Sequence, residues 1–182
     1  GSLVTPQDHA AYLERLRRVA DAALAAGCAM AITCTGNLRH GVSREDQRGS
    51  VVEVLRRAAE IAEPLGFTLV LEPLNTYTDH PGYFLDNPGD AASIVREVAS
   101  PAVKFLYDVY HMQIMAGNHI AFIRENLDII GHFHSAGVPG RHEHFDGEIA
   151  YPRILRELDR LGYDGCFGLE YLPAMQDHAE SL

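Results

Sequence analysis

Helical periodicity and short apolar runs alternate five times along the chain. Amphipathic helices are predicted over 6–26, from Ser43, from Asn87 with Pro88, over 120–127, and from Pro152. A short apolar run follows each helix, namely CAMAITCTG, FTLVLEPLN, VKFLYDVYH, IIGHFHSAG and CFGLEYLP. Short apolar strands that alternate with helices are typical of βα units, because a parallel strand pair needs a helical crossover. The pattern therefore predicts an α/β fold built on a parallel sheet of five strands.

The composition indicates one globular domain, expected over residues 1–182. Of these residues 47% are hydrophobic and 22% are charged, which is sufficient to form a buried core. Since no apolar run approaches ~18 residues and the opening has no basic start before an apolar stretch, we expect no membrane span, no signal peptide and a cytoplasmic location. Cys28, Cys34 and Cys166 form no CxxC pair, so we expect buried, reduced thiols.

The net charge of −10 narrows the choice of partners and chemistry. The chain has 25 acidic residues against 15 lysines and arginines, and this balance repels a polyanion such as DNA. The only lysine, Lys104, precedes Asp108 by four strand residues, which places it about 13 Å away at a rise of ~3.3 Å per residue. These features favour a small-molecule substrate and disfavour a Schiff base at the Asp108 end.

Four successive predicted strands end in residue types that bind metals: Glu72, Asp108, His134 and Glu170. Ligands of covered parallel sheets bind at the carboxyl ends of the strands, so inward-facing side chains there would meet in one site. Carboxylates that lie close together raise each other's pKa, and a divalent cation removes that cost. Three oxygen ligands and one imidazole predict one Mn²⁺ or Mg²⁺ ion rather than a structural zinc. Ion pairs are the alternative reading of each acid.

Other polar residues are predicted near these strand ends. His111 lies just beyond Asp108 and is expected to overhang the metal, whereas His132 is expected one layer deeper as a hydrogen-bonded core histidine. The long segment 136–152, AGVPGRHEHFDGEIAYP, follows a strand on the same face, where long loops tend to be functional. Its Arg141 suits a two-point contact with a carboxylate or hydroxyls, and a loop closed by an Arg–Glu pair is the alternative.

The stretches LEPLN, YDVYHMQIMAGN, GRHEHFDGEIAYP and LGYDGCFGLEY resemble the hydroxypyruvate isomerases, within the xylose isomerase-like superfamily of sugar isomerases and epimerases. The resemblance covers roughly residues 11–173. It implies a (β/α)₈ TIM barrel with the metal held by Glu72, Asp108, His134 and Glu170. It further implies that Glu72 and Glu170 move the proton, and that His111 and Arg141 contact the substrate.

The chain departs from that family in two respects. At His134 the isomerases are expected to have glutamine, whereas the ketose epimerases have histidine. In addition, a (β/α)₈ barrel needs about 250 residues, and this chain offers the last five βα units, with only GSLVT in place of the first three. We therefore expect one TIM-barrel domain whose N-terminal βα units are missing, as a fragment or as a short form that covers its open edges by forming a homo-oligomer.

The implied activity is that of a metal-dependent intramolecular oxidoreductase. It would interconvert hydroxypyruvate and 2-hydroxy-3-oxopropanoate through an enediolate, with proton transfer between the two glutamates. A ketose 3-epimerase is the nearest alternative. A metal-dependent endonuclease and a non-catalytic binding protein are alternatives of other classes, although the acidic charge disfavours the endonuclease.

Overall fold

The computed structural model describes residues 2–145 and 147–182 and contains one five-stranded parallel sheet. Its strands follow each other in chain order: β1 (Met30–Thr33), β2 (Thr68–Leu71), β3 (Val103–Asp108), β4 (Ile130–Ser135) and β5 (Phe167–Leu169). The helices are α1 (His9–Ala25), α2 (Arg44–Ala62), α3 (Pro88–Val98), α4 (Val109–Met115), α5 (His119–Asn126), α6 (Tyr151–Arg160) and α7 (His178–Ser181), with short 3₁₀ helices η1 (Pro6–Asp8) and η2 (Glu63–Leu65). The predicted parallel sheet is confirmed.

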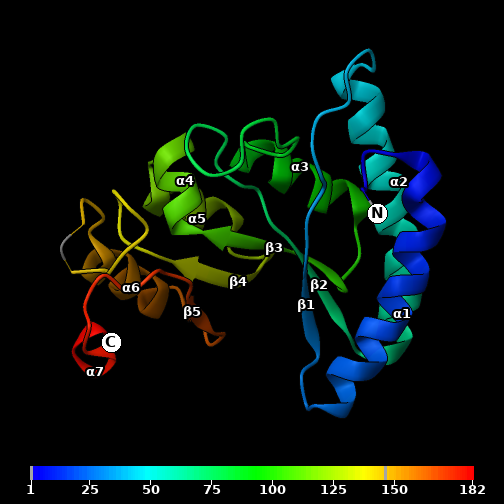
Figure 1. Cartoon of the computed structure of the whole chain (residues 1–182). Helices are drawn as coiled ribbons and strands as arrows, with labels where there is room; N and C mark the ends of the chain where they lie inside the picture. The colour runs from blue at the N-terminus through cyan, green and yellow to red at the C-terminus, as the bar shows by residue number, and fades with distance from the viewer. Residues whose placement is uncertain (1, 146) are drawn as a thin grey trace.

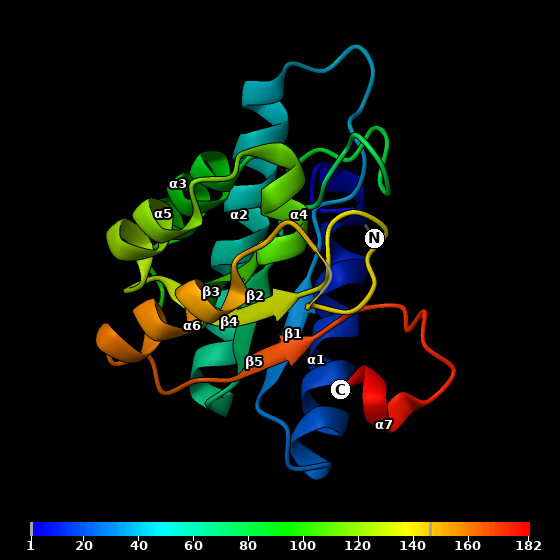
Figure 2. The same cartoon turned by 90° about the vertical axis from the view of Figure 1, so that its left-hand side faces the viewer.

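The hydrophobic core lies between the sheet and the helices, which surround the outer face of the strands (Figures 1 and 2). Leu71, Phe105 and Tyr107 point outward from β2 and β3 and are fully buried in this core. Val70 and Leu106 alternate with them, are equally buried, and lie outside the core cluster. Because side chains alternate along a strand, these two residues mark the opposite face of the sheet, the interior of a barrel.

Capping side chains fix two of the predicted helix starts. Ser43 accepts a hydrogen bond from the backbone N–H of Asp46, and Asn87 accepts from the N–H groups of Gly89 and Asp90. Both are standard N-cap contacts, which satisfy otherwise unpaired N–H groups of the first turn. The first helix differs from the prediction, since a 3₁₀ turn occupies Pro6–Asp8 and the α-helix begins at His9.

The strand predicted over 103–111 is shorter than expected. It ends at Asp108, and α4 begins at the next residue. Oδ1 of Asp108 accepts hydrogen bonds from the backbone N–H groups of Tyr110 (2.7 Å) and His111 (3.2 Å), so this side chain caps α4. His111 therefore lies on the first turn of a helix and not at the end of a strand.

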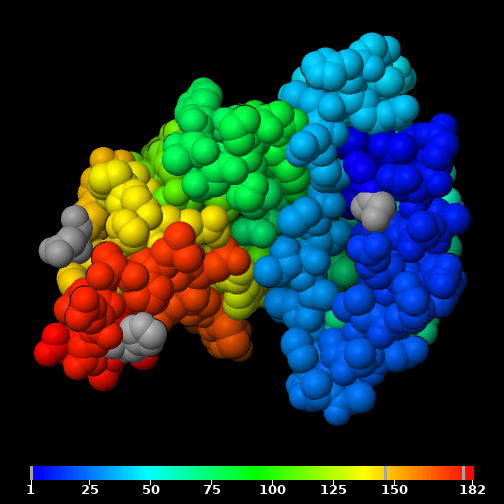
Figure 3. All heavy atoms as spheres, in the orientation of Figure 1, coloured from blue at the N-terminus to red at the C-terminus, as the bar shows by residue number. Residues whose placement is uncertain are grey.

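The sheet is open at both ends, as expected for an incomplete (β/α)₈ barrel. Among the described residues β1 pairs only with β2, and β5 pairs only with β4. Apolar side chains are exposed on both end strands, with Ile32 at 46% and Leu169 at 53%. In the space-filling view the N-terminal and C-terminal segments lie on either side of a notch (Figure 3).

The expectation of buried thiols is wrong. Cys28, Cys34 and Cys166 are free, as predicted, but all three are exposed, because they lie at the ends and edges of the short outer strands. Separately, within the part of the chain that the structure describes, no helix has the length and apolarity that a membrane crossing requires.

Candidate metal centre

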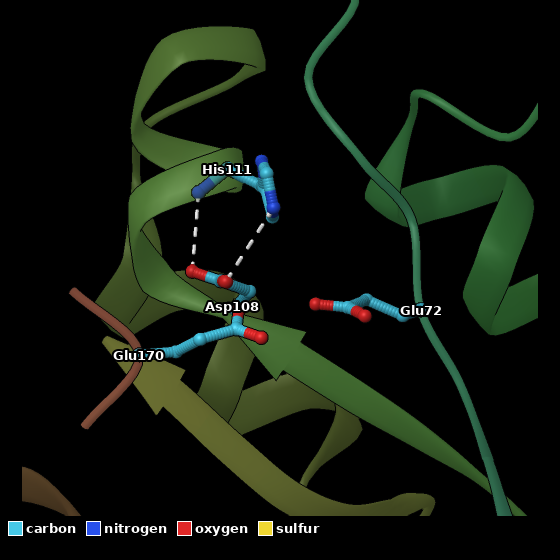
Figure 4. Close-up of side chains that lie close together, drawn as sticks. All are labelled: Glu72, Asp108, His111 and Glu170. Atoms are coloured by element: carbon cyan, nitrogen blue, oxygen red, sulfur yellow. Dashed lines mark hydrogen bonds and ion pairs between the residues drawn. The ribbon is translucent and has the colours of Figure 1, made fainter. Parts of the chain in front are cut away.

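The predicted metal-binding side chains meet at the carboxyl ends of the strands. Glu72 follows β2, Asp108 ends β3 and Glu170 follows β5, and Figure 4 shows their carboxylates pointing into one space beside the ring of His111. One ligand atom of each of these four residues lies within 4.8 Å of the others. Glu72 and Asp108 are buried, whereas the side chain of Glu170 is 45% exposed on the open side of the sheet.

His134, the imidazole ligand predicted from the sequence, borders the same space. Parallel pairing places it beside Asp108 on one side and Gly168 on the other. Its Nδ1 lies 3.8 Å from Oε1 of Glu72 and 3.3 Å from Oε2 of Glu170. The structure therefore brings all four predicted ligands together, and it adds His111 as a second imidazole.

Three buried atoms of this cluster lack hydrogen-bond partners among the described residues: Glu72 Oε1, Asp108 Oδ2 and His134 Nδ1. An unpaired buried polar atom costs roughly 1–3 kcal/mol, so three in one place need a common explanation. Ligand atoms bound ~2.1 Å from one ion lie about 3–4.2 Å apart. The set with His111 exceeds this spacing only slightly, at up to 4.8 Å, and Nδ1 of His134 lies 3.3 and 3.8 Å from two of the same carboxylates. The residues present fit a single divalent cation.

The electrostatics of the cluster favour a positive charge among the carboxylates. Burial, together with the neighbouring charge of Glu72, raises the pKa of Asp108 to about 7. Burial disfavours a charged His134, but the carboxylates of Glu170 and Glu72 outweigh it and raise the pKa of His134 to about 10. Protons on these two groups thus replace part of the charge that a cation would supply.

Arg141 lies against the cluster, on the loop between β4 and α6. Its Nη2 donates to Oε2 of Glu170 at 2.6 Å, and its guanidinium group lies over the ring of Tyr110, 5.1 Å from the centroid. Arg141 thus forms the Arg–Glu pair that was the alternative to a substrate contact, and it does so beside the space where a substrate contact was predicted. The pair joins the loop to the β5 end of the site. The nearby imidazole of His134 and the charge of Arg141 lower the pKa of Glu170.

Two other histidines differ in their surroundings. His111 is buried and its Nε2 lies 3.7 Å from Oδ2 of Asp108, as the predicted overhang requires. Burial and the nearby Arg141 lower the pKa of His111 to about 3. His132 is only half-buried and contacts His134 edge-on at 4.9 Å between ring centroids, so the prediction of a core histidine is wrong. The half-open barrel interior leaves its ring accessible.

Sequence reasoning missed a group of polar residues that surrounds His111. Asn75 is buried and contacts the His111 ring, Asp79 links Asn75 to the hydroxyl of Tyr110, and His80 lies 5.4 Å from His111 between ring centroids. The available signal was Asn75 itself, because an asparagine just after a strand commonly folds the next residues into an Asx turn.

A parallel βα sheet with metal-ligand side chains at the carboxyl ends of its strands defines a TIM-barrel protein with a site on the usual face. The chain belongs to the xylose isomerase-like TIM barrel family, whose sequence model matches residues 3–182.

Named relatives agree with this membership. The chain is 42% identical over 126 residues to the 2-oxo-tetronate isomerase of Cupriavidus necator, an alignment covering 69% of the chain and 48% of that protein. It is 34% identical over 143 residues to the hydroxypyruvate isomerase of Escherichia coli, covering 78% and 55%. A crystal structure of an AP endonuclease, family 2, from Brucella melitensis has a TM-score of 0.92 at 31% identity, covering 98% of the chain and 69% of that structure. The chain thus spans about half the length of these two isomerases.

Proposed function

We propose that the chain carries the metal site of an isomerase for small 2-oxo acids that bear a hydroxyl group on C3. The convergence of three unpaired buried atoms, on Glu72, Asp108 and His134, is the observation that carries the proposal. The names of two relatives, hydroxypyruvate isomerase and 2-oxo-tetronate isomerase, support the substrate class. Hydroxypyruvate is the simplest acid of that class, with 2-hydroxy-3-oxopropanoate as its product.

The proposed residues divide the work between binding and proton transfer. Glu72, Asp108, His134 and Glu170 would hold one Mn²⁺ or Mg²⁺ ion. When bound, a divalent ion supplies positive charge that polarises the substrate carbonyl and its neighbouring hydroxyl. One glutamate removes the proton from C3, and the other delivers a proton to C2, while the hydroxyl proton passes from the C3 oxygen to the C2 oxygen. The atoms balance, because isomerisation only relocates two hydrogens.

The two glutamates are suited to different halves of this exchange. Oε1 of Glu72 is buried and has no hydrogen-bond partner among the described residues, so it is free to accept a proton. Glu170 faces His134 and Arg141, which favour its ionised form. Arg141 and His111 border the same space and would contact the substrate oxygens.

Turnover of Glu72→Gln and Glu170→Gln tests the proposal. Glutamine keeps an oxygen ligand but cannot act as a base, so turnover of hydroxypyruvate should fall about 10²- to 10⁴-fold and stay low at saturating Mn²⁺. Solvent deuterium incorporation should fall with it. Glu60→Gln, an exposed position on α2, is the matched control and should retain turnover. The assay requires a form of the protein with measurable turnover of hydroxypyruvate. Near-wild-type rates in both site variants would contradict the assignment of proton transfer to the two glutamates.

A ketose 3-epimerase is the second candidate, and His134 favours it. The imidazole faces the carboxylates at the position where the ketose epimerases are expected to have histidine. Returning the proton to the opposite face of C3 would then give epimerisation. Product analysis on fructose, tagatose and hydroxypyruvate separates the two activities.

An endonuclease is disfavoured, although one structural relative has that name. The net charge of −10 opposes binding to a polyanion. Among the described residues, the carboxylate cluster adjoins only two imidazoles, His111 and His134, which suits one ion better than several zinc ions.

A further inference from the structure

The orientation of the Asn75 side chain is fixed by its surroundings. Its Oδ1 accepts hydrogen bonds from the backbone N–H groups of Thr78 (3.1 Å) and Asp79 (2.9 Å). Its Nδ2 lies 2.7 Å from Oδ2 of Asp79, a carboxylate that can only accept. Backbone N–H groups can only donate, so the amide oxygen must face the turn and the amide nitrogen must face inward.

That amide nitrogen meets the ring of His111. Nδ1 of His111 lies 2.8 Å from Nδ2 of Asn75 and 3.2 Å from the backbone nitrogen of the same residue. Both groups of Asn75 donate, so Nδ1 must offer a lone pair and the ring proton must be on Nε2. Nε2 is the nitrogen that faces the carboxylate cluster, 3.7 Å from Oδ2 of Asp108.

We propose that Asn75 is a positioning residue that holds His111 in the tautomer with its proton on Nε2. In this tautomer His111 offers a hydrogen-bond donor to a substrate oxygen at the cluster, and it has no lone pair to bind a metal there. The imidazole ligand is then His134, whose buried Nδ1 is unpaired among the described residues. The substrate role rests on the proposed function, whereas the tautomer rests on the hydrogen bonds alone.

The arrangement around Asn75 is stiff enough to impose one tautomer. Asn75 and His111 are both buried, so water does not compete for their hydrogen bonds. Oδ2 of Asp79 also accepts from the hydroxyl of Tyr110 at 2.7 Å, which ties the loop after β2 to the helix that carries His111. A hydrogen bond to the ring nitrogen that faces away from a site commonly fixes which nitrogen of a histidine carries the proton.

The test reads the tautomer directly, by long-range ¹H–¹⁵N correlation spectra of the 182-residue chain with ¹⁵N-labelled histidine. The His111 signals are assigned from their loss in His111→Gln. In the wild type we expect Nδ1 without a proton and Nε2 with one. The charge-balanced swap Asn75→Asp with Asp79→Asn keeps Oδ1 at the turn but replaces the side-chain donor that faces His111 by an acceptor. Only the weaker backbone N–H at 3.2 Å then still donates to Nδ1, so the fraction of His111 with a proton on Nδ1 should rise.

The matched control is Asn87→Asp. Asn87 has the turn contacts of Asn75 without the histidine, since its Oδ1 accepts from two backbone N–H groups. If Asn75 merely caps a turn, as Asn87 does, aspartate should be tolerated at both positions. The His111 signals should then be unchanged in both the swap and the control variant. Unchanged His111 signals in the swap variant would overturn the proposal. A proton on Nδ1 of His111 in the wild type would also overturn it, and that measurement does not depend on the folding of any variant.

Adding Zn²⁺, which is diamagnetic, tests the second half of the proposal. The Nδ1 signal of His134 should shift while His111 keeps its Nε2 proton, and loss of that proton would overturn the proposed role. If Zn²⁺ shifts the signals of neither histidine, the proposed metal site is wrong. The tautomer of His111 is measured independently of that outcome.

Discussion

Asp108 combines three roles within one side chain. It ends β3, and its Oδ1 caps α4 by accepting from two backbone N–H groups. Its Oδ2 is left buried and unpaired among the described residues, facing the other acids. Because the cap fixes the carboxylate, Asp108 cannot turn toward solvent, and its raised pKa follows from this position.

We predict that the buried position of Asp108 contributes a loss of stability in the metal-free chain as the pH rises. The pKa of Asp108 is raised from 3.8 to about 7, so the folded state holds a proton that the unfolded state releases, and stability is lost between those values. The raised pKa of His134 acts in the same direction. The lowered pKa values of His111 and His119 act in the opposite direction, so the effect is measured against Asp108→Asn. Relative to that variant, the free energy of unfolding in urea, after chelation, should fall by on the order of 1 kcal/mol or more from about pH 5 to about pH 7.5.

Asp108→Asn is the control for this pH effect. Asparagine retains an oxygen for the cap of α4 but carries no titratable proton. The difference in pH dependence between wild type and variant is therefore the contribution of Asp108, and an identical pH dependence in both would rule that contribution out.

At the scale of elements, the helices and strands that hydrophobic periodicity and capping residues determine could be predicted from the sequence. Ser43 and Asn87 start helices where their side chains can accept from the first turn, and the strands fall within the predicted runs. Helix α4 was missed because VYHMQIM continues the apolar run of β3, and seven residues are too few to show a helical period. The Asn75 contacts could not be predicted, because they join residues 36 positions apart.

Helix α6 carries a buried carboxylate that we predict to be essential for its docking. Glu157 receives hydrogen bonds from Arg124 of α5 and from Arg153 and Arg160 of its own helix. Glu157→Gln should lower the Tm by at least about 2 °C, because it leaves the arginines without their shared partner. Glu53→Gln, in an exposed pair with Arg57 at 3.9 Å, should change it little.

The stability that Glu157 and its three arginine partners contribute is also expected to depend on pH. Hydrogen bonds from Arg124 and Arg160 lower the pKa of Glu157 below its ordinary 4.5. Its contribution is therefore present above that value and lost as the pH falls below it, opposite in sign to that of Asp108. Equal Tm values for Glu157→Gln and wild type at neutral pH would show that the cluster contributes nothing.

At the scale of the whole molecule, the sheet has open ends on both sides. Strands β1 and β5 each lack a second partner among the described residues, and unpaired parallel edges promote association. We predict that the 182-residue chain associates or unfolds readily, and that Ile32→Lys with Leu169→Lys reduces association in light scattering. Leu65→Lys, at a 40% exposed position away from both edges, is the control. A compact, stable wild-type monomer would contradict this prediction.

The proposed metal site requires Glu72, Asp108, His134 and Glu170 to hold one divalent ion together. Calorimetric titration of the chelated chain with Mn²⁺, with elemental analysis after desalting, measures this most directly. We expect about one ion per chain in the wild type and in Asp21→Ala, an exposed position on α1. Asp108→Ala and His134→Ala, checked for folding by circular dichroism, should lose most of the bound ion. Equal binding in the wild type and both site variants, or no binding in the folded wild type, would rule out this metal site.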